Sequence, residues 1–303
     1  MGADIIFPNI GIRINNLDPV AFSPFGLDIY WYAIFVVVGI IAGYYFGGVF
    51  APKKTGQDPD VYTSLAIWVI PLAILGGRIF YLLFTPWPAD AGFFHIFNIR
   101  AGGIGIWGVI ITAVIVCAVF CRLRKISFLN LMDTAIVGLI IGHVIGRFGN
   151  FTNREAFGGY ASDGAPFAMQ LRFFAEDGTR LVRSPVSDEL FAQAHRVINE
   201  VSYIQVHPVF FYEAAINLVL FVFLNLYRKH KKFNGELIAM YFVSYGITRF
   251  ILEFMRTDAL MIGSSNVAVA HILSATAAIG GIAFLLYGHI TVNKKKLQTA
   301  KRK

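Results

Sequence analysis

The sequence has few charged residues. They make up only 15% of the 303 residues, whereas soluble domains carry roughly 25%. Hydrophobic residues make up 56%, and the mean hydropathy is +0.63. A chain with so few charges cannot cover a soluble surface with polar groups, and one so apolar is not intrinsically disordered. The composition therefore predicts an integral membrane protein.

Cysteine is nearly absent. Cys117 and Cys121 are the two cysteines, four positions apart in an apolar run, so they form neither a disulfide framework nor a metal-ligand pattern. We interpret both as core residues. No His/Glu pair has metalloprotease spacing and no Gly-x-Ser-x-Gly elbow occurs. The sequence thus predicts neither a metal site nor a cofactor. The first 22 residues also lack the basic start and apolar core of a cleavable secretion signal.

Long apolar runs dominate the chain instead, and a membrane-spanning helix needs about 20 such residues. Seven stretches qualify: 28–50, 62–84, 102–121, 127–147, 208–227, 236–256 and 266–290. We predict an all-α integral membrane protein of one domain, residues 1–303, with about seven transmembrane helices. The polar stretch 149–207 is predicted as a small extracytoplasmic head between the fourth and fifth helices, with short strands around an Asp-Gly turn.

Basic residues alternate between the connections. Every lysine lies in the first, third or fifth connection or in the C-terminal tail. By the positive-inside rule that side is cytoplasmic, so the N-terminus is predicted outside and the C-terminus inside. The net charge of +8 then reflects topology and contact with the lipid bilayer. Nucleic-acid binding would need a basic patch interleaved with base-stacking aromatics, which is lacking, so no nucleic-acid partner is predicted.

Ionisable residues recur at membrane depth, where they are costly and usually face a cavity or a partner. His143, Arg147 and Asn150 share one helix face at i, i+4 and i+7, and Arg249 and Glu253 are four apart. Each cluster keeps a structural alternative, such as a helix cap at Arg147 or a buried ion pair at Arg249. The further candidates are Tyr32, Arg78, Tyr81, Asn153, Glu155, Gly158, Glu213, Tyr245 and Arg256. Arg78 and Tyr81 could equally anchor a helix at the interface.

At these residues the chain resembles the prolipoprotein diacylglyceryl transferase family. The matching motifs are GRFGNFTNREAFG (146–158), HPVFFYE (207–213), TRFILEFMRTD (248–258), GGRIFY (76–81) and YWYAI (30–34). One departure concerns the third span, where the family commonly has a histidine. Here GGIGIWG places Trp107 at that position, and His143 is a candidate to replace it.

The resemblance implies an enzyme of the bacterial cell (inner) membrane. It would transfer the diacylglyceryl group of phosphatidylglycerol to the lipobox cysteine of a prolipoprotein signal peptide, releasing glycerol-1-phosphate. Arg147, Arg249, Glu155, Tyr245 and His143 are the predicted catalytic residues. The predicted substrate-binding residues are Arg147, Asn150, Gly158, Asn153, Tyr32, Arg78, Tyr81, Glu213, Glu253 and Arg256.

Three other functions fit the same polar residues. A secondary transporter of an anionic solute would use the same arginines, although the sequence has no internal repeat. A membrane scaffold would hold them as structural ion pairs, and a different lipid-head transferase would use another acceptor.

Overall fold

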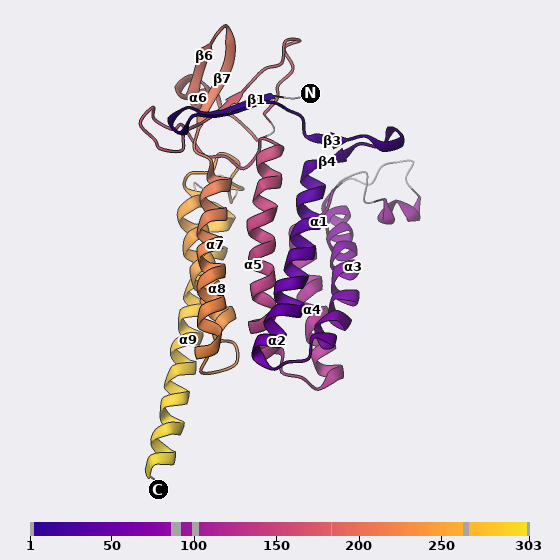
Figure 1. The fold of residues 1–303 in the computed structure, drawn as a ribbon, viewed down its shortest axis with the longest axis vertical. Helices are drawn as coiled ribbons and strands as arrows, with labels where there is room; N and C mark the ends of the chain where they lie inside the picture. The colour runs from indigo at the N-terminus through magenta and orange to yellow at the C-terminus, as the bar shows by residue number, and fades with distance from the viewer. Residues whose placement is uncertain (1–2, 86–91, 99–102, 183, 263–266, 302–303) are drawn as a thin grey trace. The chain divides into compact units, whose positions relative to one another are not determined.

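The computed structural model describes residues 3–85, 92–98, 103–182, 184–262 and 267–301 (Figure 1). The chain divides into two compact units. One consists of Met1–Gly43 with Ile136–Lys303, and the other of Tyr44–Ala135.

Helices occur at all seven predicted spans. They are α1 (Trp31–Tyr44), which a π-helix (Tyr45–Phe50) joins to α2 (Ala51–Thr55), then α3 (Pro59–Phe84), α4 (Ile106–Arg124), α5 (Phe128–Thr152), α7 (Val209–Tyr227), α8 (Glu236–Glu253) and α9 (Val269–Lys301). Among the described residues, six helical stretches are long and apolar enough to cross a membrane. The chain is therefore a mostly helical, multi-pass membrane protein.

The predicted sixth span is the exception. α8 forms at 236–253 but is not among the six apolar stretches, because its 18 residues include Glu236, Arg249 and Glu253. It packs against α7 and α9 within the same unit, and Figure 1 shows the three helices side by side. α8 thus carries charged side chains that neighbouring helices shelter.

In the unit Tyr44–Ala135, α3 and α4 pack closely through glycines. A Cβ on Gly108 would lie 2.5 Å from the Gly76 carbonyl oxygen, so no larger residue fits without a shift. Small residues at this helix interface let the two backbones approach closely. Cys117 and Cys121 are buried and free in the same unit, packed with Tyr62 and Leu131. Their interpretation as core residues is confirmed.

The other unit contains a five-stranded antiparallel sheet. Its strands are β1 (Ala3–Phe7), β2 (Ile12–Leu17), β5 (Met169–Arg172), β6 (His195–Ile198) and β7 (Val201–Val206), in the order β2-β1-β5-β7-β6. A short helix, α6 (Asp188–Ala194), precedes β6, and a small hairpin pairs β3 (Val20–Phe22) with β4 (Ile29–Tyr30). Apolar side chains of the sheet, among them Ile5, Leu171 and Ile204, share a buried core with Phe157.

This sheet includes strands from outside the predicted head. The head was assigned to 149–207 alone, but β1 and β2 from the N-terminus supply two of the five strands. In addition, α5 continues to Thr152, so the first residues of the assigned head are still helical. Strand pairing between segments so distant in sequence leaves no local pattern, which is why the N-terminal strands were missed.

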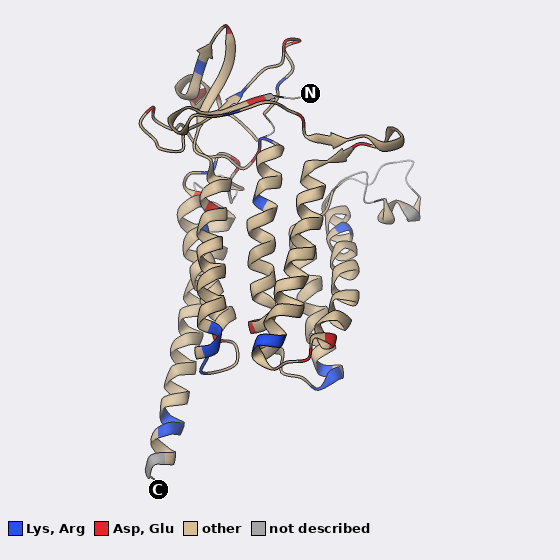
Figure 2. Cartoon of the chain, viewed as in Figure 1, with Lys and Arg blue, Asp and Glu red and all other residues tan. Residues whose placement is uncertain are grey.

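Within each unit, basic residues gather near the ends of helices. Figure 2 shows blue segments at the connection from α7 to α8 and near the end of α9, away from the sheet in that unit. In the other unit they lie at the ends of α2 and α4, where Lys53, Lys54, Arg122 and Arg124 occur.

Candidate active site

The centre of the site is an ion pair between α5 and α7. Arg147 Nη2 lies 2.5 Å from Glu213 Oε1, and Arg147 Nη1 donates a hydrogen bond to Asn150 Oδ1 at 3.4 Å. The Glu213 side chain is 1% exposed, whereas 20% of the Arg147 side chain is accessible. The carboxylate therefore orients the guanidinium, which keeps one exposed edge for another partner.

Glu155 lies just beyond the end of α5. Its Oε1 accepts hydrogen bonds from Asn150 Nδ2 at 3.0 Å and from Asn153 Nδ2 at 3.3 Å. The chain reaches this position because the last turn is closed by backbone bonds, including Glu155 N–H to the Asn150 carbonyl at 3.0 Å. A chain of hydrogen bonds thus links Glu155, Asn150 and Arg147.

Gly158 lies where three segments meet. Its N–H donates to the His207 carbonyl at 2.8 Å, and a Cβ there would lie 2.9 Å from the Met255 carbonyl oxygen and 3.1 Å from the His207 Cβ. Glycine is required by this close approach. It joins the loop after α5 to the start of α7 and to the end of α8, the three motifs that carry the family resemblance. A ligand-binding role for Gly158 stays a prediction.

The second charged group comes from α8 and the residues after it. Arg249 Nη2 lies 2.7 Å from Glu253 Oε2, and Arg256 Nε lies 4.0 Å from the same oxygen. Arg256 also forms a bidentate ion pair with Asp258. Its Nε donates to Oδ1 at 2.9 Å and its Nη2 donates to Oδ2 at 2.8 Å. Glu253 is buried, and a buried carboxylate needs a positively charged partner. Arg249 and Arg256 supply that positive charge.

Tyr245 and His143 connect the two charged groups. The Tyr245 ring stacks on Tyr241 with centroids 5.3 Å apart, and His143 lies 5.6 Å from Tyr245. The His143 ring centroid also lies 6.3 Å from that of Tyr241, so α5 packs on α8 at these rings. The structure therefore brings the predicted residues of α5, α7 and α8 into one neighbourhood.

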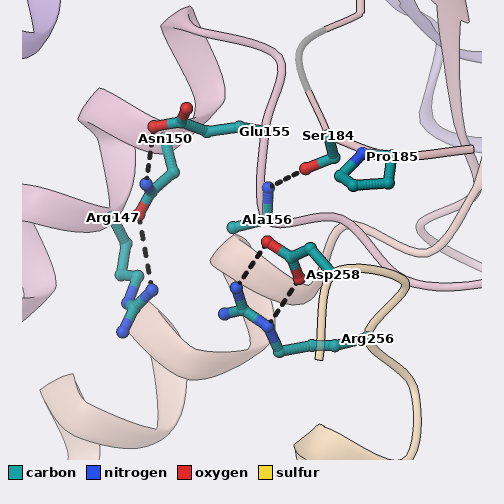
Figure 3. A pocket seen from close by; sticks show the side chains of 8 residues that line it. All are labelled: Arg147, Asn150, Glu155, Ala156, Ser184, Pro185, Arg256 and Asp258. Atoms are coloured by element: carbon teal, nitrogen blue, oxygen red, sulfur yellow. Dashed lines mark hydrogen bonds and ion pairs between the residues drawn. The ribbon is translucent and has the colours of Figure 1, made fainter. Parts of the chain in front are cut away.

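A cavity of about 220 Å³ opens beside this group (Figure 3). Its lining consists of Arg147, Asn150, Glu155, Ala156, Ser184, Pro185, Arg256 and Asp258. Figure 3 shows the Arg147–Asn150–Glu155 chain on one side and the Arg256–Asp258 pair on the other. The volume suits a small polar head group, and the arginines suit an anion.

Four lining residues are absent from the predicted set: Ala156, Ser184, Pro185 and Asp258. Asp258 ends the TRFILEFMRTD motif, so its place in that motif was an available signal. Ser184 belongs to no motif and reaches the cavity only through the fold of the head. Its Oγ accepts a hydrogen bond from the Ala156 N–H at 2.9 Å.

The remaining predicted residues lie at the edge of the site or in the other unit. Tyr32 of α1 covers Gly149, where an added Cβ would lie 2.8 Å from the tyrosine ring. Arg78 and Tyr81 belong to the unit Tyr44–Ala135, where the Arg78 guanidinium carbon lies 5.7 Å from the Tyr81 ring centroid. Their substrate-binding role stays a prediction.

Several buried polar atoms near the site find no hydrogen-bond partner in the described part of the chain. They include Glu213 Oε2, His143 Nδ1, Arg249 Nη1 and both side-chain polar atoms of Asn217, which lies one turn after Glu213. Each such atom costs roughly 1–3 kcal/mol. This cost is typical of a functional site. No group of three or more His, Cys, Asp or Glu side chains that could hold a metal occurs among the residues described.

Comparison with known proteins agrees with the motifs. A family model described as prolipoprotein diacylglyceryl transferase matches residues 19–287. The chain is 34% identical over 267 residues to the phosphatidylglycerol–prolipoprotein diacylglyceryl transferase of Finegoldia magna, covering 88% of this chain and 94% of that protein. It is 33% identical over 280 residues to the protein of the same name from Clostridioides difficile, covering 92% and 97%.

Proposed function

We propose, on the premise that the chain belongs to the prolipoprotein diacylglyceryl transferase family, that it transfers the diacylglyceryl group of phosphatidylglycerol to a prolipoprotein. The acceptor is the thiol of the lipobox cysteine, and glycerol-1-phosphate leaves. The observation that carries this proposal is the accessible edge of Arg147 on a cavity of head-group size.

The reaction breaks the bond between the glycerol carbon and its phosphate oxygen. Sulfur forms the new bond to that carbon, and the electron pair of the broken bond leaves with the phosphate. Arg147 and Arg249 bind the phosphate and stabilise its growing charge, which is a positioning and electrostatic role. Asn150 and Tyr245 donate hydrogen bonds to it. Glu213 and Glu253 orient the two arginines through their ion pairs.

The thiol must lose its proton, and a free cysteine has a pKa of about 8.5. Cationic surroundings lower that value, so a modest acceptor is sufficient. Glu155 is the better candidate because it lines the cavity, held by Asn150 and Asn153. The His143 ring packs against Tyr241 and Tyr245, and its Nδ1 is buried with no hydrogen-bond partner among the described residues. We assign the proton to Glu155.

The test is a transfer assay with purified protein. Phosphatidylglycerol and a lipobox peptide are incubated with it, and the mass of the peptide is measured by mass spectrometry to detect a diacylglyceryl adduct. A matched peptide with serine in place of the cysteine is the control and should gain no mass. Labelled glycerol released without its phosphate would contradict the bond cleavage proposed. Counterflow of an anion in vesicles without any adduct would favour the transporter instead.

The cellular setting follows from the same proposal. The protein lies in the bacterial cytoplasmic membrane with its N-terminus and sheet outside and its C-terminus inside, as the lysine distribution supports. Single-cysteine variants test this in a background with Cys117 and Cys121 replaced by alanine. A membrane-impermeant thiol reagent added to intact cells should label Val197→Cys, at the exposed position of β6, and should not label Lys231→Cys. The reverse pattern would overturn the orientation.

A further inference from the structure

The residues on both sides of Glu155 have an unusual backbone. Arg154 has φ of 54° and Ala156 has φ of 57°, so both lie in the left-handed region. Residues with a Cβ are uncommon there, and they stay there only where their surroundings hold them. The position of Glu155 therefore depends on whatever holds its two neighbours.

Arg154 is held by the extramembrane sheet region. The residue is 4% exposed. Its Nε donates to the Leu181 carbonyl at 2.8 Å, and its Nη1 donates to the carbonyl of Leu17, the last residue of β2, at 2.9 Å. A guanidinium buried on two carbonyls fixes the backbone that carries it.

Ala156 is held from the same region by a different group. Its N–H donates to Ser184 Oγ at 2.9 Å, and Ser184 is itself 4% exposed (Figure 3). The hydroxyl thus supplies the acceptor that this left-handed residue needs. Glu155 lies between the two anchored residues, and its carboxylate meets Asn150 and Asn153 at the cavity.

From these contacts we propose that Arg154 and Ser184 are positioning residues of the transferase, which hold Glu155 in place through the left-handed residues beside it. This inference rests on the proposed function, in which Glu155 receives the thiol proton. It gives the sheet and the connection from β5 to α6 a defined task, because Leu17 ends β2 and Leu181 and Ser184 lie in that connection. The N-terminal strand β2 thereby contributes to catalysis without touching the substrate.

Glycine makes the inference testable, since it adopts the left-handed region without a steric penalty. Ser184→Ala removes the acceptor for the Ala156 N–H. Ala156→Gly removes the steric cost of the left-handed backbone that this hydrogen bond holds in place. We expect kcat for transfer to the lipobox peptide to fall about 10- to 100-fold in Ser184→Ala, with little change in KM for phosphatidylglycerol. Ala156 lines the cavity, so Ala156→Gly alone sets the reference rate, and the double variant should recover most of the Ser184→Ala loss relative to that reference.

Ser187→Ala is the matched control. Ser187 also lies in the head, and its Oγ also accepts a backbone N–H, that of Leu190 at 3.1 Å, where it caps α6. This variant loses the same chemical group away from Glu155, so its kcat should stay near wild type. Arg154 gives a second pair: Arg154→Ala should lose more activity than Arg154→Gly, although both lose the guanidinium.

Three outcomes would overturn the inference: full kcat in Ser184→Ala, an equal loss in Ser187→Ala, or no recovery in the double variant. The last would mean that Ser184 acts on the substrate itself. Amide hydrogen exchange at residues 154–156 provides a readout independent of activity. It should accelerate in Ser184→Ala and not in Ser187→Ala, and unchanged exchange in both would also overturn the inference. If the wild-type protein forms no adduct, the proposed function fails while the exchange measurement still decides whether Ser184 holds the loop.

Discussion

Two arginines in helices of this protein, Arg147 in α5 and Arg78 in α3, are held in opposite ways. Arg78 is 1% exposed. Its Nη1 donates to the Gly103 carbonyl at 3.1 Å, and its Nη2 lies 3.2 Å from His95 Nε2. Arg147 pairs with a buried carboxylate and leaves a fifth of its side chain accessible at a cavity.

The difference concerns what each guanidinium can still bind. Arg78 is enclosed by groups of its own unit, including the ring of Tyr81. Arg147 has its charge oriented by Glu213 and its accessible edge directed at a space of head-group size. We therefore expect Arg147 to act on substrate and Arg78 to act first on stability. The following experiments test this comparison.

The largest effect is expected from a charge-neutral replacement of the α5–α7 pair. Arg147→Gln with Glu213→Gln should lower the transfer rate about 10²- to 10³-fold, because a donor to the developing phosphate charge is lost. Arg147→Gln alone should also destabilise the protein by about 3–5 kcal/mol, since Glu213 is left buried and unpaired. Adduct formation and thermal unfolding in detergent measure the two effects. Normal turnover in the double variant would remove Arg147 from the mechanism.

A similar loss, on the order of 10²-fold, is expected for Arg249→Gln with Glu253→Gln. The scaffold hypothesis predicts that this charge-neutral change is tolerated. The matched control is Arg13→Gln with Asp4→Asn, which removes an ion pair of 3.4 Å on the sheet and should leave the rate unchanged. Equal activity in the two double variants would favour a structural role for the α8 pair.

A smaller effect on rate is expected from Arg78→Met. The Gly103 carbonyl loses its donor, so stability should fall by about 1–3 kcal/mol. Turnover of the folded fraction should change far less than in the Arg147 variant. A loss of rate as great as that of the Arg147 variant, with stability intact, would instead support the substrate-binding role that the sequence predicted for Arg78.

The smallest effect concerns pH and His207, just before α7. Burial lowers the pKa of the His207 imidazole from its ordinary value of 6.5, and its Nδ1 lies 3.1 Å from the Tyr212 hydroxyl. The unfolded chain then binds a proton more readily, so this contribution to stability is present above pH 6.5 and is lost as the pH falls below it. Thermal unfolding at pH 7.5 and 5.5 should show a smaller difference in His207→Gln than in wild type. An identical difference would exclude His207 as its source.

Much of the site could be predicted because its parts are local. His143, Arg147 and Asn150 follow helical spacing along α5, and Arg249 and Glu253 follow it along α8, so one helix face carries each set. Glu213 was predicted from its place in the HPVFFYE motif, and the structure pairs it with Arg147. Ser184 could not be predicted, because its contact with Ala156 joins segments whose spacing follows no period.

The amino-acid order alone determined the apolar helices, the placement of basic residues at their ends and the polar residues within them. Hydropathy and helical periodicity act over a few turns, so they can be read from neighbouring residues. Only the tertiary structure decided that two N-terminal strands complete the sheet and that α8 is sheltered by α7 and α9. It also decided that Leu181 and Ser184 bond to the two neighbours of Glu155. These features depend on hydrogen bonds and packing between distant segments, which form only once the chain has folded.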